Sequence, residues 1–112
     1  MKYLLEEGAD VNKILGLSGQ TALYEAAIKG HCDVAKLLIA RGANINVKEN
    51  IINMTPLLAA SHYSHTNVVK LLLDAGADVN VTNNFGRTPL YFALRNNNTE
   101  TIDILRKHGG TT

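Results

Sequence analysis

The chain contains no tryptophan, a single cysteine and only two prolines, and aromatic residues make up 5% of it. Because Cys32 is alone, no disulfide can form within the chain, which is compatible with a reducing intracellular compartment. A core without tryptophan must be built from Leu, Ile, Val and Ala, and hydrophobic residues amount to 46% of the sequence. At 112 residues the chain suffices for one domain and is too short for two ordinary ones.

An excess of charge is also missing, because 11 lysines and arginines stand against 10 aspartates and glutamates. Nucleic-acid binders usually carry a clustered basic stripe, and none is visible, so no nucleic-acid partner is expected. No apolar run approaches the ~18–20 residues of a membrane-spanning helix. The start, Met1-Lys2-Tyr3, leads directly into an acidic segment, unlike a signal peptide. We therefore expect no membrane association and an intracellular protein, cytoplasmic or nuclear, with secretion into a host cell left open.

What the sequence does contain is a pair of phrases that recur at a fixed period. The first phrase returns at intervals of 34 and 33 residues, as Thr21-Ala-Leu-Tyr-Glu-Ala-Ala27, Thr55-Pro-Leu-Leu-Ala-Ala-Ser61 and Thr88-Pro-Leu-Tyr-Phe-Ala-Leu94. The second follows an apolar run each time, as Glu7-Gly-Ala-Asp-Val-Asn12, Arg41-Gly-Ala-Asn-Ile-Asn46 and Ala75-Gly-Ala-Asp-Val-Asn80. Such a period predicts a protein built of stacked repeats.

Each repeat has residues that favour the start and the end of two short helices. The threonine that opens the first phrase is a good helix N-cap, and Pro56 and Pro89 follow at the first helical position. The first helix should end at a residue with left-handed backbone, and Gly30, Ser64 and Asn97 stand there. Ser64 departs from the glycine or asparagine that suits this conformation, so a modest strain is expected at its turn. The second helices should end at Gly42, Gly76 and Gly109.

Both phrases resemble the signature of the ankyrin repeat family, Thr-Pro-Leu-His near one helix start and Leu-Leu-Leu-x-x-Gly-Ala-x-x-Asn later. The resemblance covers nearly the whole chain and implies an all-α solenoid of stacked antiparallel helix pairs joined by short β-hairpin loops. We expect a single domain, 1–112, with a partial repeat at 1–12, a first repeat at 13–46, a second at 47–80 and a third, capping-like repeat at 81–112. The histidine of the family phrase is replaced by Tyr24, Leu58 and Tyr91. Its hydrogen bonds between repeats should therefore be absent or altered.

The N-terminal half-repeat leaves its role open. Residues 1–8 correspond only to the later part of a second helix, so Tyr3, Leu4 and Leu5 would lack part of their usual packing. We favour a cut inside a longer array over two alternatives, a naturally minimal cap and the contact surface of a dimer. A monomer is otherwise expected. At the other end, the more polar last helix is suited to a terminal repeat, whose outer face no neighbour covers.

Histidine and cysteine side chains raise the question of a metal or a nucleophile. His31 and His65 occupy the same position in consecutive repeats, and equivalent points on stacked helices lie about 8–10 Å apart, too far to share a zinc ion. In the family this position orients the turn between the two helices. No partner base stands near Cys32, no glycine-rich phosphate loop follows a strand, and no Ser-His-Asp or paired-carboxylate arrangement is present. We expect no metal, no cofactor, no catalytic residue and no enzyme activity.

The loops between repeats carry apolar side chains that a polar-edged hairpin does not need for its own stability, which favours a binding role. In the family, hairpin tips and the exposed side of the first helices line a concave groove that holds other proteins. Carried over by position, the candidate partner-binding residues are Ile14, Leu15, Leu17, Glu25, Ile28, Lys29, Ile51, Ile52, Met54, His62, Tyr63, Phe85, Arg87, Phe92, Arg95 and Asn96, with Ala59 on the same helix face. About half of Ile14, Leu17, Ile51 and Met54 should instead pack inward.

The function predicted from these features is non-catalytic binding of a partner protein through that concave face. Apolar loop residues would anchor the partner, while Glu25, Lys29 and Arg95 would add polar selectivity. Tyr63, Phe85 and Arg95 are the single residues most expected to matter, because Tyr and Arg are enriched at binding hot spots. The alternative is a fragment of a longer array whose role is structural, or self-assembly through the N-terminal face.

Overall fold

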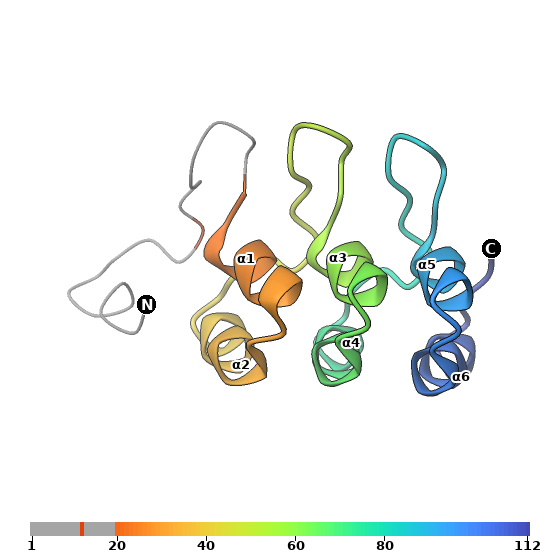
Figure 1. Ribbon diagram of the computed structural model, residues 1–112. Coiled ribbons are helices and arrows are strands. Elements are labelled where there is room, and N and C mark those ends of the chain that lie inside the picture. The colour runs from red at the N-terminus through yellow and green to blue at the C-terminus, as the bar shows by residue number, and fades with distance from the viewer. Residues whose placement is uncertain (1–11, 13–19) are drawn as a thin grey trace.

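The computed structural model describes residue 12 and residues 20–112, and within them it forms an all-α solenoid (Figure 1). Its helices are α1 (Ala22–Lys29), α2 (Cys32–Ala40), α3 (Pro56–His62), α4 (Thr66–Asp74), α5 (Pro89–Arg95) and α6 (Thr99–Lys107). The first helices α1, α3 and α5 pack side by side in one row, and α2, α4 and α6 form a second row against them. The resulting body is elongated, 41 × 25 × 20 Å. This confirms the predicted helix pairs.

The start of each first helix is fixed by its threonine, as the sequence predicts. Oγ1 of Thr21, Thr55 and Thr88 accepts a hydrogen bond from the backbone N–H three residues later. All three caps have extended backbone and are buried, so the cap also fills space in the core. Replacing such a cap by alanine typically costs ~1 kcal/mol.

The ends of the helices fall where the sequence places left-handed residues. Gly30, Ser64 and Asn97 end the first helices with φ of 73°, 62° and 55°. The glycines after the second helices also have positive φ. Ser64 therefore adopts a conformation that disfavours a side chain, in agreement with the strain predicted there.

The core lies between the two rows and is aliphatic. Its fully buried large side chains include Leu23, Leu38, Leu57, Leu58, Val68, Val69, Leu72 and Leu105. Leu58, one of the residues that replace the family histidine, is completely inaccessible to solvent. Polar bonds between repeats are made elsewhere: the His65 ring Nε2 lies 2.9 Å from the carbonyl oxygen of Ile28. The predicted orienting role of that histidine is thus realised across two repeats.

Asparagines form a second connection between repeats. Asn12 Oδ1 accepts from the Asn44 N–H at 2.6 Å, Asn46 Oδ1 accepts from the Asp78 N–H at 3.2 Å, and Asn80 Oδ1 accepts from the Thr111 N–H at 2.8 Å. The side chain at the end of each recurring Gly-Ala phrase therefore holds the turn that follows the next second helix. This ladder runs along the whole described stack.

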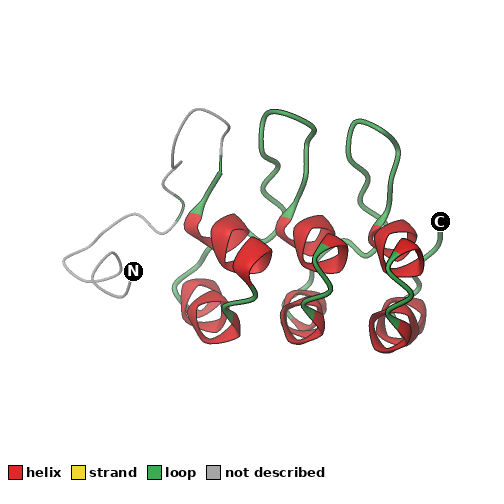
Figure 2. Ribbon diagram, in the orientation of Figure 1, coloured by secondary structure: helices red, strands yellow, loops and turns green. Residues whose placement is uncertain are grey.

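The second loop (47–54) and the third loop (81–87) leave the helices on the same side and turn back on themselves (Figures 1 and 2). Each is crossed by a backbone hydrogen bond, from Glu49 N–H to the Met54 carbonyl and from Asn83 N–H to the Arg87 carbonyl. Neither loop contains a β-strand. The expected hairpin shape is present without a β-ladder, because side chains rather than paired strands satisfy the backbone inside these two loops.

Candidate partner-binding groove

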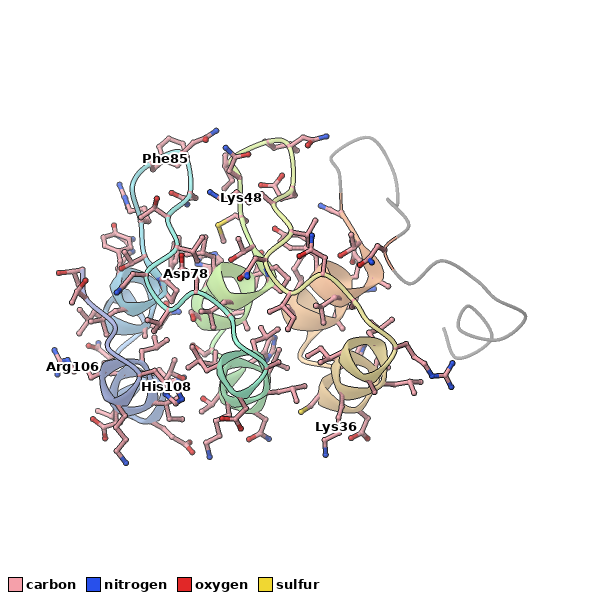
Figure 3. The ribbon with its side chains drawn as sticks, turned by 180° about the vertical axis from the view of Figure 1, so that it is seen from behind. Lys36, Lys48, Asp78, Phe85, Arg106 and His108 are labelled. Carbon is pink, nitrogen blue, oxygen red and sulfur yellow. The ribbon has the colours of Figure 1, made fainter. Side chains whose placement is uncertain are left out.

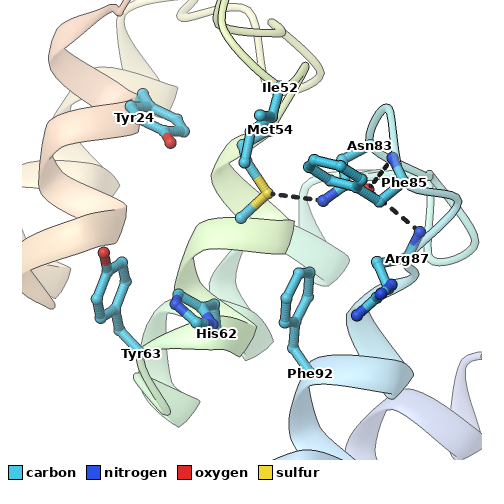
Figure 4. Close-up of a pocket in the computed structure, with 9 residues that line it drawn as sticks. All are labelled: Tyr24, Ile52, Met54, His62, Tyr63, Asn83, Phe85, Arg87 and Phe92. Atoms are coloured by element: carbon cyan, nitrogen blue, oxygen red, sulfur yellow. Dashed lines mark hydrogen bonds between the residues drawn. The ribbon is translucent and has the colours of Figure 1, made fainter.

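A groove of about 400 Å³ lies in the angle between the loops and the first helices. All three repeats contribute to it (Figure 4). Its lining consists of Tyr24 from the first repeat, Ile52, Met54, His62 and Tyr63 from the second, and Asn83, Phe85, Arg87 and Phe92 from the third. The volume lies within the range of about 300–1,000 Å³ typical of ligand-binding clefts.

The second loop is shaped by the buried carboxylate of Glu49. Its Oε2 accepts from the N–H of Ile51 at 2.7 Å, and its Oε1 accepts from the N–H groups of Ile52 and Met54, both at 3.0 Å. Burial alone would raise the pKa of this carboxyl, but the three backbone donors together bring the pKa below its ordinary value. Glu49 therefore remains ionised near neutral pH and holds the loop closed from inside.

The third loop uses Asn83 in the same way. Its Oδ1 accepts from the N–H of Phe85 at 2.9 Å and from the N–H of Arg87 at 3.2 Å. Asn83 stands 34 residues after Glu49, at the equivalent position. The second loop is one residue longer and supplies one more N–H, which the second carboxylate oxygen accepts. Asn83 Nδ2 also lies 3.4 Å from the sulfur of Met54, linking the two loops across the groove (Figure 4).

Aromatic rings form the helix side of the groove. His62 lies edge-on to Phe92 with ring centroids 5.0 Å apart, and edge-on to Tyr63 at 4.6 Å. The hydroxyl ends of Tyr24 and Tyr63 point toward each other (Figure 4). Burial raises the pKa of Tyr24 to about 12, with smaller contributions from Glu49, Tyr63 and Glu25. Both the acidic neighbours and the burial keep Tyr24 neutral, so it presents a hydrogen-bonding hydroxyl and no charge.

A family model for ankyrin repeats in three copies matches residues 1–49 and 46–111. The chain belongs to the ankyrin repeat family. A comparison with curated proteins finds no match. Ankyrin repeats generally mediate binding between proteins and are typically non-catalytic. The part of this ankyrin repeat protein that the structure describes contains no helix long and apolar enough to cross a membrane.

The apolar candidates of the loops divide between the surface and the interior of the ankyrin stack. The side chains of Ile51, Phe85 and Tyr63 are 69%, 65% and 51% exposed, and Figure 3 shows Phe85 at the far end of its loop. Met54 is buried, and Ile52 is half-buried against the core. About half of four apolar loop residues are expected to pack inward, and two of the four lie among the described residues. Of these two, Met54 packs inward and Ile51 points outward.

The polar and helical candidates also differ in what they present. Arg87 is half-buried beside the groove, and Arg95 and Lys29 are exposed, while Glu25 and Ile28 are half-buried. Asn96 is exposed, but its Nδ2 donates to the carbonyl of His62 at 2.6 Å, so it joins the second and third ankyrin repeats. Ala59 is completely buried, and its predicted place on the accessible face is wrong, because its helix α3 is packed between α1 and α5. Ile14, Leu15 and Leu17 lie outside the described residues.

Sequence reasoning missed Tyr24 and Asn83 among the residues that line the groove, and it missed Glu49, which holds the second loop. A single glutamate in a polar loop looks like a solvated side chain. The signal that could have found it is periodicity, because Glu49 and Asn83 are oxygen-bearing side chains at equivalent positions of two repeats.

The clustering of potential metal ligands can be examined among residues 12 and 20–112. They contain no group of three His, Cys, Asp or Glu side chains placed to hold a metal ion. Cys32 is a free, half-buried thiol at the start of α2. What the groove offers is therefore apolar and aromatic surface with hydrogen-bonding groups and arginine at its border.

Proposed function

We propose that these ankyrin repeats form a non-catalytic module that binds a partner protein through the groove between the loops and the first helices. The observation that carries the proposal is the composition of the groove, in which every repeat supplies at least one aromatic ring. Exposed Tyr63 and Phe85 line it together with buried Met54 and half-buried Ile52. Aromatic anchors around a preformed apolar hollow are the arrangement found at binding hot spots.

A preformed site favours affinity because little of the protein must be ordered when the partner binds. Both described loops are fixed internally, by Glu49 and by Asn83, and Phe85 is displayed on a loop whose Phe85 and Arg87 N–H groups are already bonded to Asn83. Glu25, Lys29 and Arg95 flank the aromatic rings on the first helices and are suited to selecting among partners. No bound cofactor is needed for this function.

The test is capture of proteins from a source-cell lysate by the chain and by a variant with Tyr63→Ala and Phe85→Ala. Both side chains are more than half exposed, so the variant should keep its helical circular dichroism and lose its partner. Leu94→Ala is the matched control, because Leu94 is another large exposed apolar side chain in the described part of the chain and does not line the groove. Equal capture by the chain and the double variant would refute the proposal.

The alternative role, self-assembly through the N-terminal half-repeat, rests on Leu4 and Leu5, which lie outside the described residues. It remains a separate hypothesis with its own measurement. Light scattering of the chain and of a variant with Leu4→Glu and Leu5→Glu distinguishes the two, because a dimer lost in the variant would assign contact to that end.

A further inference from the structure

A cluster of donors lies beside the groove on the third repeat. Tyr91 and Arg95 are four residues apart and lie on one side of α5, and Arg87 stands just before the Thr88 cap of this helix. The guanidinium carbon of Arg87 is 4.3 Å from the centroid of the Tyr91 ring, and that of Arg95 is 6.0 Å from it. Two positive charges therefore converge on one aromatic ring.

The hydrogen bonds of this cluster leave it without an acceptor. Arg87 Nη1 donates to the Tyr91 hydroxyl oxygen, and Arg95 Nη1 lies 3.4 Å from the same oxygen. With its oxygen accepting from both arginines, Tyr91 has its own hydroxyl proton left to donate. Within the described residues the hydroxyl finds no acceptor, and neither guanidinium pairs with a carboxylate.

The cluster is also held in place before any partner arrives. The backbone N–H of Arg87 is fixed by Asn83 at 3.2 Å, and Tyr91 is on the first turn of α5, where its N–H is bonded to Thr88 Oγ1. Two like charges close together repel each other, and an anion placed against them relieves that repulsion. The site thus presents two guanidinium groups and one hydroxyl donor to an oxyanion.

We propose that the Arg87–Tyr91–Arg95 cluster binds an acidic side chain of the partner protein, next to an apolar side chain of the same partner seated in the groove. The proposal deepens the binding function proposed above and rests on it. Its ligand is a peptide segment that carries a carboxylate beside an apolar residue. Arg87 belongs to both features, since it lines the groove and contacts Tyr91. The apolar residue and the acidic residue of the partner must therefore lie close together in its peptide segment.

The probe is a library of random linear peptides displayed on phage and selected on the intact chain. Enriched peptides should pair an apolar residue with an aspartate or glutamate at a constant spacing. A synthetic peptide of the consensus should bind about tenfold or more weakly to Arg87→Gln and to Arg95→Gln, the usual effect of losing a hydrogen bond to a charged group. Replacing its acidic residue by the corresponding amide should weaken binding to the chain equally and have little further effect on the variants.

Lys36→Gln is the matched control, because it removes the same charge from exposed Lys36 on α2, on the helix row away from the loops (Figure 3). Binding should be unchanged in this variant. Consensus peptides without an acidic residue, failure of any peptide to enrich, or equal binding by the arginine variants would overturn the proposal. Peptides that lose binding with Tyr63→Ala and Phe85→Ala but not with the arginine variants would leave the groove function standing and reject the acidic anchor alone.

Discussion

At the scale of single residues, Glu49 links the chemistry of one side chain to the shape of the proposed binding surface. It is 3% exposed, and its two oxygens satisfy three backbone N–H groups of the second loop. An aspartate, being one methylene shorter, would not reach all three donors from the same backbone position. The presence of glutamate at this position therefore determines the backbone conformation of the second loop, which carries the exposed side chain of Ile51.

Glu49→Gln should destabilise the fold by about 1.5–3 kcal/mol at pH 7, because charge-assisted hydrogen bonds are replaced and the amide turns a donor toward the loop. The pKa of Glu49 is lower in the folded protein than its ordinary value, so its contribution is complete above the unfolded pKa of about 4.3 and is lost as the pH falls through the folded pKa. Urea unfolding followed by circular dichroism at both ends of this window measures it. A difference between the chain and the variant that persists unchanged in acid would contradict this account.

At the scale of the secondary-structure elements, the turn that ends α1 is coupled to the start of α4. Gly30 has φ of 73°, and a Cβ at this position would lie 2.5 Å from Nδ1 of His65. The ring cannot move away freely, because its Nε2 is engaged with the Ile28 carbonyl at 2.9 Å. One repeat later, Ser64 stands in the position of Gly30, and Asn98 stands in the position of His65. Asparagine has a shorter side chain than histidine.

Gly30→Ala should therefore destabilise the fold more than Gly86→Ala, by about 1 kcal/mol, the value of one lost hydrogen bond. Gly86 is the matched control, because its φ is 71° and a Cβ there meets nothing within 4 Å. Both substitutions share the penalty of left-handed backbone, about 1–2 kcal/mol. Thermal unfolding of the two variants measures the difference, and equal melting temperatures would show that the His65 ring yields without loss.

At the scale of the whole molecule, stability is a sum of repeats and of the contacts between neighbours. Between the second and third repeats, Oγ1 of Thr66 lies 2.8 Å from Oγ1 of Thr101, which is completely buried. Asn98 Nδ2 reaches the same Thr66 oxygen at 3.3 Å. The Thr66 hydroxyl thus joins α4 to Thr101 of α6 and to Asn98, the N-cap of α6.

Thr66→Val should weaken this junction by about 1–2 kcal/mol, since two polar groups lose their partner. The loss should be local, with amide hydrogen exchange accelerated in α5 and α6 more than in α1 and α2. Thr66→Ser keeps the hydroxyl and should restore protection. Uniform acceleration along the whole stack would instead show that the repeats unfold as one cooperative unit.

The repeat architecture could be predicted from the sequence because its signals are local and occur three times. The threonine caps, Pro56, Pro89 and the left-handed residues depend on the chain within a few positions, and the structure places them as expected. The candidate groove could be predicted only in part. Met54 and Ile51 are both apolar loop residues, yet one is buried and one exposed, because that choice depends on Asn83 and other side chains contributed by the next repeat.

The sharing of the groove among all three repeats has a consequence for how such a chain can change over generations. Duplicating a repeat at either outer edge would leave Tyr24, Met54 and Phe92 in their present relation. Inserting a copy between the second and third repeats would move Arg87 and Phe92 away from Tyr63 by the thickness of one helix layer, about 10 Å. Recombination between these two repeats would therefore erase the groove in one event, whereas the repeat number could change at the outer edges of the stack without loss of the groove.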